Sequence, residues 1–336
     1  MTTFIVAAQG STEQSSPGLQ EIGYWNKGGG RHNAVGKLIW DFGEAGKPFV
    51  HITSEGTESL ESATVRYRTD FHNRNQGIMD PSVLQEKEVT IFGLGSVGAK
   101  LALDLTRAGV GRLTLIDPDR VSVSNLCRCE YDLFDLGRSK TEALTARMLA
   151  INPKMRIACH DEDLLQMSSA LEDVICRSHL VVGATDNPGA QRVINSTAYH
   201  HVPSLYPGVY PQGMGGEIII TIPGETACME CVLKNILSQS LSPKRGTWDY
   251  ATEGQLKPEA ALIADIQNIV TNTTKLALAL LSRGEDGSKL SSFINPKHNV
   301  LFICNEVEED WLFEYPFQTI WASSEVNEDC WCRTLA

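Results

Sequence analysis

The sequence predicts an α/β fold: a doubly wound, mostly parallel sheet with an antiparallel C-terminal extension, preceded by a small N-terminal α+β module. Three observations lead to this prediction. A glycine-rich turn joins an apolar segment to a helical pattern at 93–98, strand-like and helix-like segments alternate from residue 88 onward, and residues 179–184 form an almost wholly apolar run. Such a run is typical of a buried parallel strand, because helices cover both faces of a parallel sheet.

Residues 88–117 have the order of a Rossmann-like βαβ unit. Apolar residues at 89–94 predict a strand that runs into the glycine turn, and a helix follows, with Gly109 at its C-terminal cap. A second strand ends at Asp117, roughly 20 residues after the glycines, where an acid can bind a ribose hydroxyl. Three glycines would let the backbone approach a phosphate at the helix N-terminus: Gly93, Gly95 and Gly98.

Residues 1–80 are expected to form the N-terminal module, because they hold only short apolar pieces among glycine, serine and threonine. The module ends in a basic segment, and no chemistry is assigned to residues 1–65. Residues 81–336 are expected to form the larger domain. Its further predicted elements are helix 139–150, strand 156–159, helix 167–176, strand 179–184, a helix from 188, strands 203–209 and 217–222, helix 259–281, and strands 299–303 and 317–322.

Charge and cysteine usage exclude several classes of protein. The net charge of −12 argues against a general binder of nucleic acid or of anionic membranes. The opening residues lack the basic region of a signal peptide, and no apolar stretch approaches 18 residues. The nine cysteines are grouped rather than spread as a disulfide framework. A cytoplasmic protein with a metal site is therefore expected.

Two groups of residues predict chemistry. Asp186 follows an apolar strand at the edge where open α/β sheets bind ligands, so it could hold Mg²⁺ against nucleotide phosphates; as the alternative, it caps the next helix. Asn125, Arg128 and Lys140 lie between the two acids in sequence. Arginine and lysine supply the planar fork and the point charge that a triphosphate site needs, although each alone is more often a solvated surface charge.

Two close cysteine pairs, Cys228-x-x-Cys231 and Cys330-x-Cys332, can supply four thiolates to a structural zinc ion. The alternative is four ordinary reduced cysteines.

The segments VTIFGLGSVGAKLALDLTRAGVGRLTLIDPDRVSVSNLCRC, GRSKTEA, INP, ATDN and CMEC resemble the adenylating core of the ubiquitin-activating superfamily. This superfamily includes ThiF-type sulfur-carrier adenylyltransferases and bacterial ubiquitin-like conjugation enzymes. The resemblance implies that the three glycines hold phosphate, that Asp117 binds ribose, that Asn125, Arg128 and Lys140 contact ATP phosphates, and that Asp186 binds Mg²⁺. It also implies a homodimer in which Arg74 reaches the partner's site, with Arg66 and Arg68 as rivals. Cys129 departs from the usual glutamine.

In the same superfamily the segment at 238–258 crosses over the substrate tail, and thioester-forming members have a cysteine where this chain has Ala251. A methyl group cannot act as a nucleophile. Either the reaction stops at the acyl-adenylate, or alanine replaces a native cysteine and traps the enzyme, or the alignment is shifted by a few positions.

The expected function is activation, with ATP, Mg²⁺ and Zn²⁺, of the C-terminal glycine of a ubiquitin-like β-grasp protein, and transfer to a conjugating enzyme could follow. A sulfur-carrier adenylyltransferase, a tRNA-modifying dehydratase and a catalytically silent nucleotide-binding scaffold are alternatives. The acidic chain lacks an evident RNA-binding stripe, which disfavours the dehydratase. A plain NAD dehydrogenase would not explain Arg128, Lys140, Asp186 and the cysteine pairs together.

Overall fold

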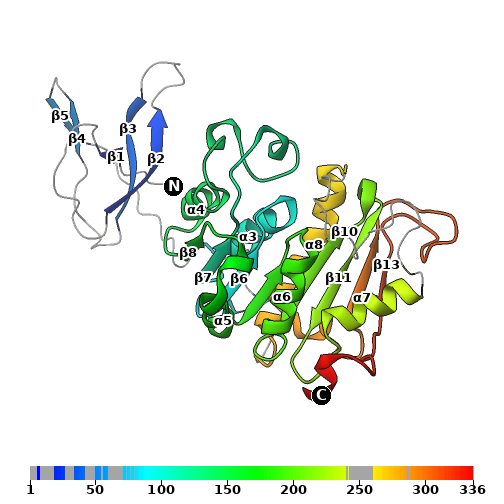
Figure 1. The fold of residues 1–336 in the computed structure, drawn as a ribbon. Helices are drawn as coiled ribbons and strands as arrows, with labels where there is room; N and C mark the ends of the chain where they lie inside the picture. The colour runs from blue at the N-terminus through cyan, green and yellow to red at the C-terminus, as the bar shows by residue number, and fades with distance from the viewer. Residues whose placement is uncertain are drawn as a thin grey trace. The chain divides into compact units, whose positions relative to one another are not determined.

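The structure is a computed structural model that describes residues 80–239, 241, 260–285 and 288–335, together with parts of 71–78 and strand backbone within 6–59. The chain separates into two compact units (Figure 1). One unit comprises Met1–Arg74 with Leu149–Pro153, and the other comprises Asn75–Met148 with Lys154–Ala336.

The described elements between residues 6 and 59 are five strands. The strands β1 (Val6–Ala7), β2 (Leu19–Asn26) and β3 (Ala34–Asp41) form an antiparallel sheet in the order β1-β3-β2. The strands β4 (Val50–Thr53) and β5 (Gly56–Ser59) form a separate antiparallel pair.

The second unit is organised around an eight-stranded sheet in the order β13-β12-β11-β10-β9-β6-β7-β8. The strands from β10 to β8 pair in parallel, whereas β11, β12 and β13 pair antiparallel. The predicted mixed sheet with an antiparallel C-terminal part is therefore confirmed. The strands are β6 (Glu88–Phe92), β7 (Arg112–Ile116), β8 (Arg156–His160), β9 (Leu180–Gly183), β10 (Ser204–Val209), β11 (Gly215–Thr221), β12 (Val300–Cys304) and β13 (Thr319–Ala322).

Helices cover both faces of this sheet. Ile269 of α8 lies against Gly216, whereas Ile219 packs in one core with Val232 of α7. Residues 216 and 219 point to opposite faces of their strand, so α8 and α7 cover opposite faces; α6 and α7 lie in front of the sheet in Figure 1. The helices are α2 (Pro81–Gln85), α3 (Ser96–Ala108), α4 (Lys140–Ile151), α5 (Ser168–Arg177), α6 (Pro188–Ala198), α7 (Met229–Ser238) and α8 (Ile263–Leu281).

Three helices differ from the prediction. The short helix α2 and the helix α7 have no predicted counterpart, although the buried residues Met229, Val232 and Ile236 of α7 recur at helical spacing. The helix α8 begins at Ile263 rather than at 259, because the backbone of Leu262 is extended and that residue serves as the N-cap. Among the described helices, none has both the length and the apolarity needed to cross a membrane.

Candidate functional site

The carboxyl ends of four parallel strands meet at one edge of the sheet. Backbone hydrogen bonds continue the ladder beyond the strand ends: Gly93 N donates to Ile116 O (2.9 Å), Ala184 N to Phe92 O (2.8 Å), and Asp117 N to His160 O (3.2 Å). The glycine turn, Asp117 and the segment that leads to Asp186 therefore lie at the same edge, where open α/β sheets bind their ligands.

The three predicted glycines have different surroundings. Gly93 has a φ of +86°, and a Cβ there would lie 2.6 Å from Ala184 O. A Cβ on Gly98 would lie 1.9 Å from Gly93 O, so both positions need glycine for close backbone packing. Gly95 is the N-cap of α3, and a Cβ there would meet nothing within 4 Å. The open part of the turn is thus at Gly95, at a helix N-terminus whose dipole favours anions.

Asp117 and Lys140 form a buried ion pair, with Lys140 Nζ 3.3 Å from Asp117 Oδ2 and 2.8 Å from Asp119 Oδ2. Burial raises the pKa of Asp117, and Lys140 offsets part of that increase. Burial alone would lower the pKa of Lys140, but the two carboxylates outweigh it and raise the pKa of this amine. Lys140 is therefore held as a cation beside the glycine turn.

Arg128 lies in a turn that Asn125 stabilises. Asn125 is the last residue of the 3-10 turn Val123–Asn125, and its Oδ1 accepts from Ser122 N (2.8 Å) and Ser122 Oγ (3.0 Å). The backbone N–H of Arg128 donates to Asn125 O at 3.2 Å, and the arginine is half-buried. The predicted phosphate contact of Asn125 stays a prediction; the structure shows that its carboxamide shapes the turn before Arg128.

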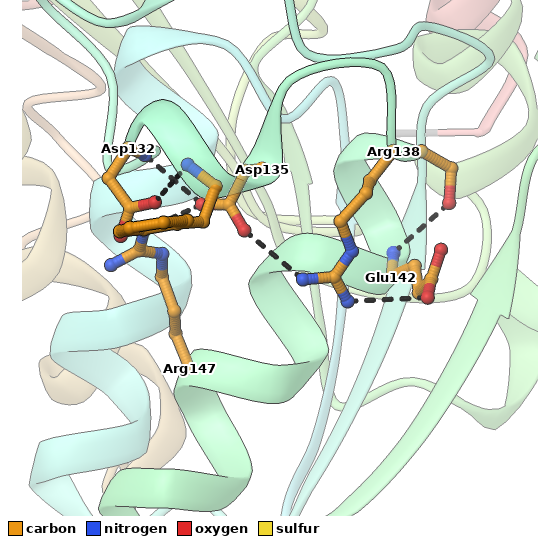
Figure 2. Close-up of polar contacts among 7 residues, drawn as sticks. Asp132, Asp135, Arg138, Glu142 and Arg147 are labelled. Atoms are coloured by element: carbon orange, nitrogen blue, oxygen red, sulfur yellow. Dashed lines mark hydrogen bonds and ion pairs between the residues drawn. The ribbon is translucent and has the colours of Figure 1, made fainter.

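A network of ion pairs ties the Arg128 segment to α4 (Figure 2). Arg147 of α4 donates to Asp132 and to the buried Asp135, the latter at 2.6 Å. Arg138 bridges Asp135 and Glu142, at 3.2 Å to each carboxylate. Figure 2 shows Asp135 between the two arginines. The network fixes the segment that follows Arg128 against the helix that begins with Lys140.

Asp186 is exposed and does not cap α6. The N-cap is Asn187, whose Oδ1 accepts from Ala190 N at 3.1 Å. The alternative interpretation of Asp186 as the cap is therefore wrong by one residue, because Asn187 directly precedes the proline that opens the helix. The carboxylate of Asp186 stays at the sheet edge, where its Mg²⁺ role is a prediction.

Sequence reasoning missed Tyr131. Its hydroxyl donates to the carbonyl oxygen of Leu94, inside the glycine turn, at 2.8 Å. Both side chains are buried. Burial raises the pKa of Tyr131, and the nearby Asp117 carboxylate raises it further, so the phenol keeps its proton. A tyrosine in a polar, charge-rich stretch gives no sequence signal for this long-range contact.

The four predicted cysteines meet, with all four Sγ atoms within 4.8 Å of one another. Cys228 and Cys330 are 3.6 Å apart at sulfur, as are Cys231 and Cys332, and Cys330 and Cys332 are 3.4 Å apart. Tetrahedral zinc with Zn–S bonds of about 2.3 Å places its sulfurs roughly 3.8 Å apart. The donor set and the spacing therefore fit zinc better than four unrelated thiols.

The two halves of this cluster come from distant parts of the chain and are braced together. Cys228 and Cys231 lie at the start of α7, and the other pair lies at the C-terminus. Trp331 Nε1 donates to Glu230 Oε2 at 2.7 Å, and Asn327 N donates to Cys231 Sγ at 3.3 Å. Burial raises the pKa of Cys231, and a bound cation would stabilise its thiolate form.

The geometry of the site leaves several of the predicted residues untested. Ala251 lies outside the described residues, as does most of the predicted crossover segment at 238–258. Arg66 and Arg68 also lie outside them. Arg74 is exposed and belongs to the first unit, so its role across a dimer stays a prediction.

Known proteins with similar sequences include ubiquitin-like modifier-activating enzyme 5 from several organisms. The Caenorhabditis elegans enzyme is 28% identical over 207 residues, which cover 58% of this chain and 48% of that protein. The Dictyostelium discoideum enzyme is 29% identical over 219 residues, covering 62% and 56%. The chain thus spans about half the length of the curated relatives it matches.

Solved structures share the fold at low sequence identity. The structure of E. coli MccB with AMPCPP and MccA has a TM-score of 0.58 and 16% identity, covering 78% of this chain and 73% of MccB. PaaA has a TM-score of 0.53 and 20% identity, covering 79% of this chain and 85% of PaaA. The ThiF family model matches residues 74–300, which is more than half of the sequence and includes the whole sheet edge described above. This chain is a member of the ThiF family.

Proposed function

We propose that the chain is an ATP-dependent adenylating enzyme that activates the C-terminal carboxylate of a ubiquitin-like β-grasp protein. The observation that carries this proposal is the open helix N-terminus at Gly95 with the cationic Lys140 beside it. The segment that carries Arg128 follows β7 and is held in place by ion pairs to Arg147. This arrangement suits a nucleoside triphosphate. The substrate class rests on the relatives, which are named as activators of ubiquitin-like modifiers.

The chain's own residues would divide the work of binding ATP. The turn at Gly95 and the first N–H groups of α3 would face phosphate, and Asp117 would accept from ribose. Arg128 would offer a planar fork to the phosphates and Lys140 a point charge. Asp186 would hold Mg²⁺, which neutralises phosphate charge when bound.

The chemistry needs positioning more than proton transfer. The glycine carboxylate of the partner attacks the α-phosphorus, a new P–O bond forms, and the bond to the bridging oxygen of pyrophosphate breaks. The products are the acyl-adenylate and pyrophosphate. The nucleophile is already an anion, so no general base is required. Arg128 and Lys140 would stabilise the charge that develops on the α-phosphate oxygens.

Later steps depend on Ala251. A thioester at this position requires a cysteine, so the chain as it stands would stop at the acyl-adenylate; with a cysteine there, transfer to a conjugating enzyme could follow. A homodimer would bring Arg74 of one protomer to the other's phosphates. A sulfur-carrier adenylyltransferase would use the same core residues. The fate of the acyl-adenylate, a thiocarboxylate or a thioester, separates the two pathways.

The test is ATP–pyrophosphate exchange with a small β-grasp protein that ends in glycine and is encoded beside this gene. Exchange should require both proteins and should disappear when the terminal glycine is deleted. The Arg128→Ala variant should lower the exchange rate by about a hundredfold or more, since a lost electrostatic donor to the transition state typically costs that much. Exchange that is absent although the partner binds would refute adenylation and favour a silent scaffold.

The Ala251→Cys variant tests the second step in the same assay. A thiol-sensitive adduct that forms only in this variant would place the nucleophile at 251. Exchange without any adduct would favour an adenylyltransferase that stops at the mixed anhydride.

A further inference from the structure

We propose that Tyr131 is a positioning residue that fixes the orientation of the Leu94–Gly95 peptide and so sets the affinity of the glycine turn for phosphate. The inference rests on the proposed nucleotide site. Its starting point is the hydrogen bond from the buried Tyr131 hydroxyl to Leu94 O, at 2.8 Å.

Leu94 is held at three points. Its side chain is fully buried in the core, its N–H donates to Asp117 Oδ2 at 2.6 Å, and its carbonyl accepts from Tyr131. With the first two contacts in place, the remaining freedom is rotation of the peptide plane between Leu94 and Gly95. The Tyr131 hydroxyl removes that freedom.

The orientation of this peptide decides where one donor points. In a planar trans peptide the carbonyl and the following N–H point in opposite directions. The Leu94 carbonyl faces Tyr131, so the N–H of Gly95 faces away from it. A Cβ added at Gly95 would meet nothing within 4 Å, so no side-chain contact at that residue holds the peptide in place. Glycine also tolerates both orientations of the plane. The contact that fixes the orientation of this peptide plane must therefore come from another residue, and Tyr131 provides it through its hydrogen bond.

Tyr131 also links the glycine turn to the segment that carries Arg128. It precedes Asp132, which is held by Arg147, and follows Arg128 by three residues. A single side chain thus joins the glycine turn to the segment that carries Arg128. Removal of its hydroxyl should weaken phosphate binding without disturbing the rest of the nucleotide.

The chain offers a matched control. Tyr199 is also buried, and its hydroxyl donates to a backbone carbonyl, that of Thr226, at 2.7 Å. It packs edge to face against Trp331 beside the cysteine cluster rather than against the glycine turn. The Tyr131→Phe and Tyr199→Phe variants therefore lose the same kind of hydrogen bond at two different places.

The experiment measures dissociation constants of ATP and of adenosine by calorimetry for the wild-type chain and both variants. In Tyr131→Phe the constant for ATP should rise about three- to tenfold, as expected for one hydrogen bond, while that for adenosine stays unchanged. Tyr199→Phe should change neither. Equal weakening of ATP and adenosine, no weakening, or the same loss in Tyr199→Phe would overturn the inference. If wild-type protein binds no ATP, the proposed function fails and takes this inference with it.

Discussion

Replacement of Lys140 by methionine tests the charge balance of the site. The substitution leaves the Asp117 carboxylate, which is only 4% exposed, without its cation. Loss of one partner of a buried pair costs about 3–5 kcal/mol in unfolding free energy. The lower end is expected here, because Leu94 N and Asp119 N still donate to that carboxylate. Removal of Asp119 as the other partner should cost less than about 1 kcal/mol, since its side chain is 67% exposed.

The stability loss caused by Lys140→Met should depend on pH, and its direction follows from the pKa of Asp117. Burial raises the folded-state pKa of Asp117, so the stability that comes from protonating it is fully present below about pH 4 and is lost as the pH rises through the folded value. Without Lys140 that folded pKa rises further. The free-energy loss of Lys140→Met should therefore be largest at neutral pH and should shrink on acidification towards about pH 5.

Urea unfolding followed by circular dichroism measures these differences. Asp119→Asn is the control that keeps the buried pair. Lys140→Met combined with Asp117→Asn should recover part of the loss, because no buried charge is left unpaired, although one of the two backbone N–H donors at Asp117 then faces the asparagine amide. A loss of unfolding free energy in Lys140→Met that is the same at neutral pH and at about pH 5 would refute the ion pair as the source of stability. A double variant no more stable than Lys140→Met would refute it as well.

Three further substitutions test the glycine turn and the cysteine cluster. Gly98→Ala should destabilise the fold by about 3 kcal/mol in urea unfolding, because its Cβ meets Gly93 O at 1.9 Å, whereas Gly95→Ala, with open space, should leave stability within about 1 kcal/mol; equal losses would contradict the assigned packing. The wild-type chain should contain one zinc per chain by elemental analysis, and Cys332→Ser should lose that zinc and melt at lower temperature. A zinc content that Cys332→Ser leaves unchanged would rule out the cluster as the ligand set.

Much of the sheet was predictable because its signals are local. The strand β9 is buried along its whole length, which matches an unbroken apolar run, and Gly109 adopts the left-handed conformation expected of a helix cap. The helix α7 shows the limit of this reasoning. Its apolar spacing is as clear as that of α3, but the Cys228-x-x-Cys231 pair at its start drew the interpretation towards a metal ligand rather than a helix.

Contacts between distant residues were less predictable. The close spacing within each cysteine pair predicted a shared metal site. The two pairs come together because α7 packs against the last described residues, where Trp331 donates a hydrogen bond to Glu230. The N-cap of α6, in contrast, depends on the local sequence alone. Asp186 and Asn187 both suit an N-cap, and the position of the following proline decides in favour of Asn187.

The arrangement of the candidate site follows from strand register. The glycine turn and Asp117 come together because β6 pairs with β7 in the register Phe92 to Ile116, which places the residues after both strands side by side. Sequence alone identifies those two ends but not their register, since a one-residue shift would keep both motifs and move every side chain to the other face. A motif therefore predicts which chemistry a sheet edge offers, and the pairing of the strands determines which polar groups hold it in place.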